Sequence, residues 1–508
     1  MNRVLPMFCL LCLLACNSRE QAPATAASAP PQTAKEPEAP LAVNPLYRQL
    51  YEAHETYREP AIGQQRFKQV DIEPLILHLK APFDVHKAGQ SIEGRGIYLV
   101  KLGNGPKPVL LWSQMHGDEP TATMALLDIF NFFSASDGFD DLRRRLLNEL
   151  TLYFIPMLNP DGAEKFKRRN AIDIDLNRDA LRLQCPEARL LKKVRDETQA
   201  QWGFNLHDQS RYYGAGYDNA TASISFLAPA YNLNKDINEV RGNAMQLIAL
   251  LNQSLQEFIP DKVARYDDEF EPRAFGDNIQ KWGTSTILIE SGGLADDPEK
   301  QELRRLNFTI LLAAFDAIAS GSYEQANIQD YEKIPFNNNN AFHDLIIREA
   351  QLQKNGQWYT VDLGFRHNQA DYNSYTSYYP RATLADIGDL STFHAYESFD
   401  ARGYRIVPGR TYGTVLPNLS ALRRLDLTAL LRQGYTVFQL QQQPKPQEWA
   451  EIPAEITKPG SSPANEIRLN GNPSFLLQKD GAFHYAVVNG FIYSLAKGAE
   501  RLRKNAGG

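Results

Sequence analysis

Short apolar runs alternate with longer helical patterns along the first two-thirds of the chain. Pro108–Trp112, Leu150–Ile155 and Ser285–Ile289 have the length and the apolar content of buried strands. Between them, Thr121–Phe133 and Leu233–Phe258 place apolar residues at intervals of three and four, which is typical of helices. Strands that alternate with helices predict an α/β domain, with a mixed and mostly parallel sheet flanked by helices.

The pattern changes after the helical segment that ends near Ala317. We expect the α/β domain to span residues 46–330, and the asparagine run at 337–340 to mark a junction. Short alternating strands separated by turns then predict a β-rich accessory domain over residues 341–440. A polar, proline-rich stretch follows, and a last small β unit is expected over residues 465–500.

The N-terminus has a pattern of its own. Arg3 precedes the apolar run Val4–Ala15, which has the length of a secretory signal and is too short to span a bilayer. The run ends at Cys16, and this ending resembles the bacterial lipobox, in which the cysteine becomes the lipidated first residue. We expect residues 1–16 to be a lipoprotein signal and Cys16 to carry a lipid anchor. An ordinary signal peptide with incidental cysteines is the alternative.

The composition after Cys16 agrees with an exported, anchored protein. Residues 17–45 are rich in Ala, Pro, Ser, Thr and Gln, which predicts a disordered tether. Asn17 is not the aspartate that resembles an inner-membrane retention signal, so we expect the periplasmic face of the outer membrane. Only Cys185 would remain as a free cysteine, so no internal disulfide is expected. The net charge of -6 gives no reason to expect a nucleic-acid partner.

Candidate metal-binding residues lie where predicted strands end. His116 and Glu119 follow the strand that ends at Trp112, and His207 follows the predicted strand Gly203–Leu206. Ligand sites in open α/β sheets lie beyond the carboxyl ends of strands. Two imidazoles and one carboxylate form an open tetrahedral zinc site, with a fourth position left for water.

Further short motifs lie between and after these residues. They are Asn159–Gly162, Arg168–Ala171, Asp175–Arg178 and Ile287–Gly293. The whole series resembles the zinc carboxypeptidase family, the carboxypeptidase A-like metallopeptidases, over about Leu46–Ala317. The resemblance implies that His116, Glu119 and His207 bind one Zn²⁺ ion.

The same resemblance implies roles for four other residues. Asn177 and Arg178 match the pair that holds the terminal carboxylate of a peptide substrate, and Glu290 matches the general base. Arg168 matches the arginine that polarises the scissile carbonyl, with Arg169 as the alternative. A zinc ion activates water and polarises a carbonyl, while a carboxylate moves the proton.

The sequence leaves some residue roles and the exact activity open. The late tyrosine of the family has no clear match, and Tyr266 is the nearest candidate. Arg273 or Asp277 would select a charged substrate side chain if their loop builds the specificity pocket. The alternatives to a carboxypeptidase are a zinc amidase or deacylase of the succinylglutamate desuccinylase and aspartoacylase type, and a non-catalytic envelope binding protein. The oligomeric state is not predicted.

Overall fold

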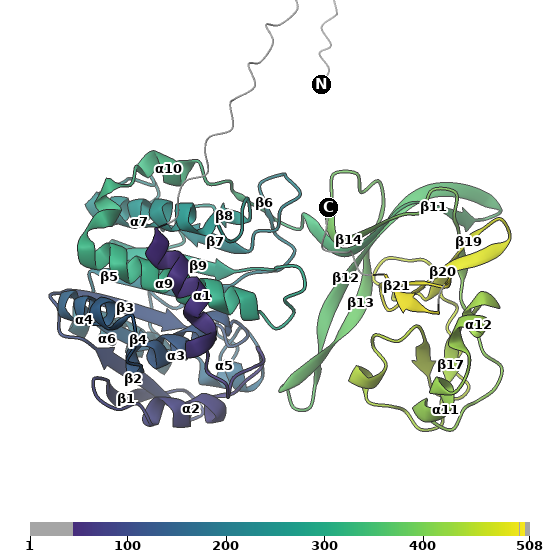
Figure 1. Cartoon of the computed structure of the whole chain (residues 1–508), viewed down its shortest axis with the longest axis horizontal. Helices are drawn as coiled ribbons and strands as arrows, with labels where there is room; N and C mark the ends of the chain where they lie inside the picture. The colour runs from purple at the N-terminus through teal and green to yellow at the C-terminus, as the bar shows by residue number, and fades with distance from the viewer. Residues whose placement is uncertain (1–43, 497, 503–508) are drawn as a thin grey trace, which may run out of the picture. The chain divides into compact units, whose positions relative to one another are not determined.

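The computed structural model describes residues 44–496 and 498–502 (Figure 1). The predicted signal, Cys16 and nearly all of the predicted tether lie outside these residues. Within the described ranges, no helix has both the length and the apolar character needed to cross a membrane.

The first domain is built on an eight-stranded mixed sheet, with strand order β1-β2-β4-β3-β5-β9-β7-β8. Its strands are β1 (Asp84–Gln90), β2 (Gly96–Leu102), β3 (Lys107–Ser113), β4 (Leu150–Ile155), β5 (Trp202–Asp208), β7 (Ile224–Leu227), β8 (Val263–Arg265) and β9 (Ser285–Ser291). The central strands β4, β3, β5 and β9 are parallel neighbours. The predicted mixed, mostly parallel sheet is therefore confirmed.

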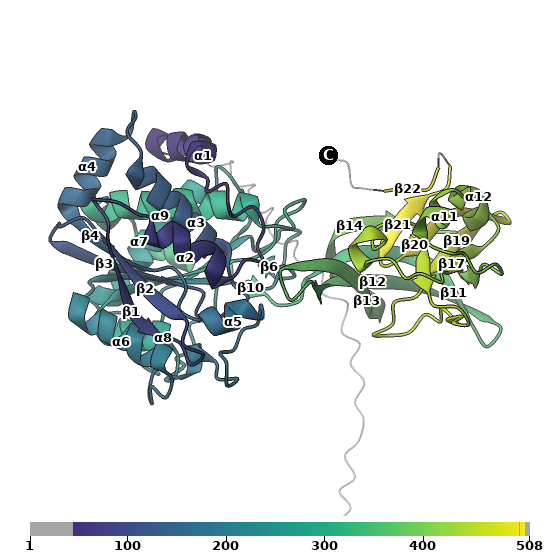
Figure 2. The same cartoon turned by 90° about the horizontal axis from the view of Figure 1, so that it is seen from below.

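Helices cover both faces of this sheet (Figure 2). They are α1 (Pro45–Tyr57), α2 (Gln69–Leu77), α3 (Thr121–Ser134), α4 (Asp140–Glu149), α5 (Pro160–Glu164), α6 (Pro186–Thr198), α7 (Glu239–Leu255), α8 (Phe275–Lys281), α9 (Gln301–Ser320) and α10 (Ile328–Glu332). Val109 and Leu111 of β3 face the core that contains α3, α7 and α9. Leu110 and Trp112 face the opposite core with α6 and α8, as the alternation of strand side chains requires.

The predicted helix Leu233–Phe258 is shorter in the structure, where α7 begins at Glu239. Asn238 is the reason, because its side chain accepts a hydrogen bond from the backbone N–H of Arg241 and so caps the helix start. The apolar residues Leu233 and Ile237, which had suggested an earlier start, are exposed in the preceding loop. The apolar pattern predicted the helix but not its first residue.

The C-terminal region contains a nine-stranded sheet with the order β13-β12-β11-β15-β19-β20-β21-β22, and β14 pairs with β11. Its strands are β11 (Phe342–Lys354), β12 (Gln357–Tyr372), β13 (Ser377–Gly388), β14 (His394–Asp400), β15 (Arg405–Pro408), β19 (Phe475–Lys479), β20 (Ala482–Val488), β21 (Phe491–Ser494) and β22 (Glu500–Arg501). The segments expected as an accessory domain and a separate small unit share this sheet, because β15 pairs with β19.

A smaller element packs beside this sheet. It consists of β16 (Arg410–Thr411), β17 (Tyr435–Gln439) and β18 (Glu455–Thr457), together with α11 (Leu419–Arg423) and α12 (Leu427–Arg432). The C-terminal region also joins the first domain through a two-stranded pairing of β6 (Gly214–Ala215) with β10 (Asn337–Asn338). The predicted junction at 337–340 therefore contains a short strand.

Candidate active site

The three predicted metal ligands lie at the carboxyl ends of two neighbouring strands. His116 and Glu119 are in the loop between β3 and α3, and His207 is the penultimate residue of β5. β3 and β5 are parallel and hydrogen-bonded, with Ser113 opposite Leu206. This pairing brings the loop after β3 beside the end of β5, although 88 residues separate Glu119 from His207.

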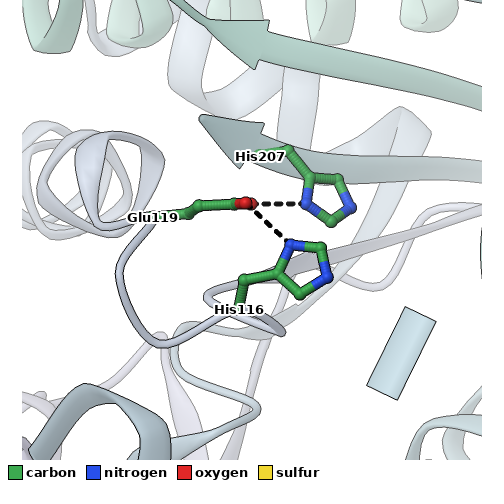
Figure 3. A group of neighbouring side chains, drawn as sticks. All are labelled: His116, Glu119 and His207. Atoms are coloured by element: carbon green, nitrogen blue, oxygen red, sulfur yellow. Dashed lines mark hydrogen bonds and ion pairs between the residues drawn. The ribbon is translucent and has the colours of Figure 1, made fainter. Parts of the chain in front are cut away.

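The three side chains converge, as Figure 3 shows. The Glu119 carboxylate lies between the rings, with Oε1 2.8 Å from Nδ1 of His116 and Oε2 2.6 Å from Nδ1 of His207. One ligand atom from each residue lies within 4.8 Å of the others, and all three residues are buried. Two imidazole nitrogens and a carboxylate oxygen at this spacing fit a zinc ion with an open coordination position.

Asp175 contacts the ring nitrogen of His116 that does not face Glu119. Its Oδ1 lies 3.1 Å from Nε2 of His116, on the side of the ring away from Glu119. A metal-bound histidine commonly donates its second N–H to a carboxylate, which fixes the tautomer and leaves the other nitrogen free to bind the ion. Asp175 therefore favours the Nε2–H tautomer of His116, with the Nδ1 lone pair directed toward the centre of the triad.

Charges within the triad suit a cation. Burial opposes ionisation of Glu119, but His116 and His207 outweigh it and hold its pKa below the usual value. Burial lowers the pKa of His207, which favours the neutral ring that metal ligation requires. Burial also opposes protonation of His116, yet Glu119 and Asp175 outweigh it and raise its pKa. A divalent ion entering the triad would displace that proton.

Arg168 reaches the triad from the segment after α5. Its Nε donates to Oδ2 of Asp175 at 3.0 Å, and its Nη1 lies 3.2 Å from Oε1 of Glu119. Arg169 points elsewhere and donates to the backbone carbonyl of Asp173 at 2.9 Å. Of the two arginines left open by the sequence, Arg168 is the one beside the metal ligands, and its side chain stays 43% exposed.

Glu290 stands next to this group. It lies on β9, in register with His207 on β5. Its Oε2 is buried and has no hydrogen-bond partner within the described chain. Burial raises the pKa of Glu290 well above the usual value, and the charges of Glu119 and Asp208 add to this effect. A buried carboxyl with a raised pKa beside a metal triad is suited to proton transfer.

Comparison with known proteins agrees with this geometry. Residues 80–218 match the zinc carboxypeptidase family, and this stretch contains all three residues of the triad. Over these residues the chain is similar to zinc carboxypeptidases. Carboxypeptidase SOL1 of Arabidopsis thaliana is 26% identical over 178 residues, which cover 29% of this chain and 36% of that protein.

Other known proteins similar to this chain are also partial matches. Carboxypeptidase 2 of Trichophyton rubrum is 27% identical over 164 residues, 30% of each chain. The chain thus spans about a third of the length of these relatives. A solved metallo-carboxypeptidase from Burkholderia cenocepacia has 16% identity and a TM-score of 0.41, over 51% of this chain and 70% of that one.

The predicted carboxylate-binding pair lies in the turn after Asp175. Asn177 is nearly buried, and its Oδ1 accepts a hydrogen bond from the backbone N–H of Phe275 at 2.9 Å. Arg178 is more open, with 38% of its side chain exposed and its Nε 3.4 Å from Glu271. Within the first domain, this pair therefore borders α8 rather than the triad itself.

The loop expected to build a specificity pocket holds a buried carboxyl. Asp277 accepts the backbone N–H of Glu271 at 2.9 Å, and burial raises its pKa to about 7. Arg273, the other candidate, is exposed and pairs with Glu271. Tyr266 stacks edge-on near Tyr213, and its pKa is raised by burial and by the charge of Glu290.

Sequence reasoning gave no role to several residues that shape the candidate active site. Asp175 was part of a recognised motif, yet its contact with His116 spans 59 positions and leaves no local signal. Asp208 accepts hydrogen bonds from Thr121 Oγ1 at 2.7 Å and Lys300 Nζ at 3.1 Å. The position of Asp208, directly after a predicted ligand, is the only sequence signal that points to it.

Proposed function

We propose that this protein is a zinc carboxypeptidase that hydrolyses the C-terminal amide bond of peptides. The observation that carries the proposal is the pairing of Glu290 with His207 beside the His116–Glu119–His207 triad. A metal site and a raised-pKa carboxyl then share one edge of one sheet. The match to the zinc carboxypeptidase family supports the same activity.

The chemistry divides between the metal and the protein. Bound zinc supplies an activated water and polarises the scissile carbonyl. Glu290 accepts the proton of that water on its unpartnered Oε2 and delivers it to the leaving amine. Burial raises the pKa of Glu290, which makes its carboxylate a stronger base toward the proton of water.

Two arginines recognise the substrate in this proposal. Arg168, fixed by Asp175 and partly exposed, donates to the carbonyl oxygen as negative charge develops there. Arg178 and Asn177 bind the free carboxylate at the end of the peptide. The Nε of Arg178 lies 3.4 Å from Glu271, which is a long ion pair, and the side chain is 38% exposed. A substrate carboxylate can therefore compete with Glu271 for this guanidinium.

We also propose that the enzyme works in the cell envelope, attached by a lipid on Cys16. The apolar run before Cys16 and the Ala/Pro-rich stretch after it support this location. The periplasmic face of the outer membrane follows from the residue after Cys16, Asn17. Metabolic labelling with a fatty-acid analogue tests the anchor, because Cys16→Ala would abolish labelling and release the protein from the membrane fraction.

The activity itself is tested by a substrate panel. Purified protein is incubated with unblocked peptides and, separately, with N-acyl amino acids, and mass spectrometry identifies the products. Stepwise loss of C-terminal residues is expected, with no release of acyl groups. Release of acyl groups alone would assign the deacylase function instead. A protein that takes up no zinc and cleaves neither class would be an envelope binding protein.

A further inference from the structure

Three segments that carry active-site residues also contact the C-terminal β-rich region. The segment after His207 does so through Arg211 and Tyr212, which face Asp344 on β11. The loop after Glu290 does so through Pro298, whose carbonyl accepts from the Tyr378 hydroxyl at 3.1 Å. The third segment is the one that leads to Arg168.

Phe166, two residues before Arg168, takes part in this third contact. The Arg66 guanidinium lies over the Phe166 ring at 4.2 Å and over the Tyr378 ring at 5.0 Å. Arg66 also donates to Asp371 at the end of the β12–β13 hairpin, at 2.8 Å. The β-rich region therefore contacts the chain close to a metal ligand and to the general base, and it connects to the segment of the predicted oxyanion arginine through Arg66.

Arg211 is the cation at the centre of this boundary. Its Nη2 lies 3.3 Å from Oδ1 of Asp344, and its guanidinium lies 4.4 Å from the ring of Tyr396 on β14. The Tyr396 hydroxyl donates to the backbone carbonyl of Arg211 at 2.7 Å. Two strands of the β-rich region thus hold both the backbone and the side chain of Arg211.

The end of the catalytic strand β9 packs directly on Arg211. A Cβ added to Gly293 would lie 2.5 Å from Cβ of Arg211 and 2.3 Å from the Tyr396 hydroxyl, so only glycine fits there. The backbone N–H of Gln209 also donates to the carbonyl of Ser291 at 3.0 Å, which extends the β5–β9 ladder past His207. Arg211 therefore lies beside the chain three residues beyond Glu290.

Not all of the hydrogen-bonding capacity of Arg211 is used by the protein. Its Nε is buried and has no partner within the described chain, while 37% of the side chain as a whole is exposed. Asp344 is shared, because its Oδ2 also accepts from the Tyr212 hydroxyl and from the backbone N–H of His367, both at 2.6 Å. A partly exposed guanidinium that shares its counter-ion with other donors can bind a second carboxylate.

Position decides which part of a substrate Arg211 would meet. Asn177 and Arg178, the proposed binders of the terminal carboxylate, border α8 and Glu271. Arg211 lies on the boundary with the β-rich region, four residues from His207, a separation of at most about 14 Å. An extended peptide advances about 3.3 Å per residue, so a separation of this size corresponds to at most about four residues of substrate.

We propose that Arg211 binds the carboxylate of an acidic side chain upstream of the scissile bond, and that the β-rich region builds this subsite by holding Arg211 through Asp344 and Tyr396. The inference rests on the proposed carboxypeptidase function. It makes the enzyme selective for acidic peptides, and it gives the β-rich region a part in substrate selection.

Matched peptides test the subsite. One series carries Glu at the second, third or fourth position upstream of the scissile bond, and its partner series carries Gln at the same positions. The wild-type protein is expected to show a kcat/KM at least about tenfold higher for Glu at one of these positions. Arg211→Gln is expected to bring that ratio close to one, and Arg211→Lys to retain part of it.

Two controls separate selection from general damage. A blocked dipeptide substrate ends before the subsite, so Arg211→Gln should leave its kcat/KM and the zinc content unchanged. Arg381→Gln, at a position on the surface of β13, removes the same charge and should keep the Glu preference.

The outcomes distinguish this inference from the function on which it rests. If wild-type protein cleaves Glu and Gln peptides equally, the acidic subsite is refuted while the carboxypeptidase function stands. If it cleaves no peptide of either series, the carboxypeptidase function itself fails. The wild-type ratio decides between these outcomes even if the Arg211 variants do not fold.

Discussion

His207 and Glu290 face each other in register on the neighbouring parallel strands β5 and β9. One hydrogen-bonded ladder therefore sets the position of a proposed metal ligand and of the proposed general base. Because both residues lie on paired strands, the spacing between this metal ligand and the base does not depend on loop conformation. The same ladder continues through Gln209 and Ser291 toward the β-rich region.

Replacing Glu290 with Gln should separate zinc binding from turnover. The amide keeps the shape of the side chain but cannot accept the proton of water, so kcat should fall about 10²- to 10⁴-fold while zinc content stays at the wild-type level. Kinetics and elemental analysis on the same samples measure both. Glu149→Gln on α4 is the matched control, and an unchanged kcat in Glu290→Gln would show that another group is the base.

Arg168 and Arg169 form a natural matched pair. Arg168 contacts Glu119 and Asp175, whereas Arg169 bonds the carbonyl of Asp173. Arg168→Met should lower kcat by about 10²- to 10³-fold, as expected when one oxyanion donor is lost. Arg169→Met should remain within about twofold of wild type, as is typical of surface substitutions. The reverse order of effects would assign the oxyanion role to Arg169.

The terminal carboxylate of the substrate should be essential. Peptides amidated at the C-terminus offer no charge to Arg178, so wild-type protein should cleave them poorly compared with the free acids. Arg178→Met should raise KM for the free acids by at least about tenfold and reduce the difference between the two series. Equal cleavage of amidated and free peptides by the wild type would remove Asn177 and Arg178 from the proposal.

Asp277 should make stability depend on pH. Burial raises its pKa from 3.8 to about 7 in the folded protein. Between about pH 4 and pH 7 the folded state then binds more protons than the unfolded state, so stability falls as pH rises through this window. Across this window, the free energy of unfolding of Asp277→Asn should rise relative to that of the wild type by up to about 1.4 kcal/mol per pH unit.

Thermal unfolding from pH 4 to pH 8 measures this difference. Asp267→Asn is the control, because Asp267 is 71% exposed in the loop before α8, the helix that carries Asp277. Its unfolding curve should follow the wild type across the whole range. If the Asp277→Asn protein also followed the wild type, Asp277 would ionise near its ordinary pKa in the folded protein.

The sequence predicted the centre of the site because each ligand lies at the end of a strand or shortly after it. His116, Glu119 and His207 lie within a few residues of clear apolar runs, so the parallel sheet alone brings them together. The contact between Asp175 and His116 could not be predicted from the sequence, because it depends on the path of a loop. The pairing of Arg178 with Glu271 is of the same kind.

The C-terminal region was less predictable for a related reason. Alternation of polar and apolar residues identifies a strand but says nothing about its partner. Pairing of β15 with β19 joins residues some 70 positions apart, and it merges two segments that the sequence separates. The contact of Arg211 with Tyr396 likewise spans the boundary between the two regions and required the folded structure.

The central claim is that one zinc ion binds His116, Glu119 and His207. Anomalous diffraction from crystals of the zinc-loaded protein, recorded on both sides of the zinc absorption edge, tests it most directly. We predict one peak per chain, about 2.0–2.2 Å from Nδ1 of His116, Nδ1 of His207 and the Glu119 carboxylate. Zinc bound at another site, with these three side chains uncoordinated, would contradict the account.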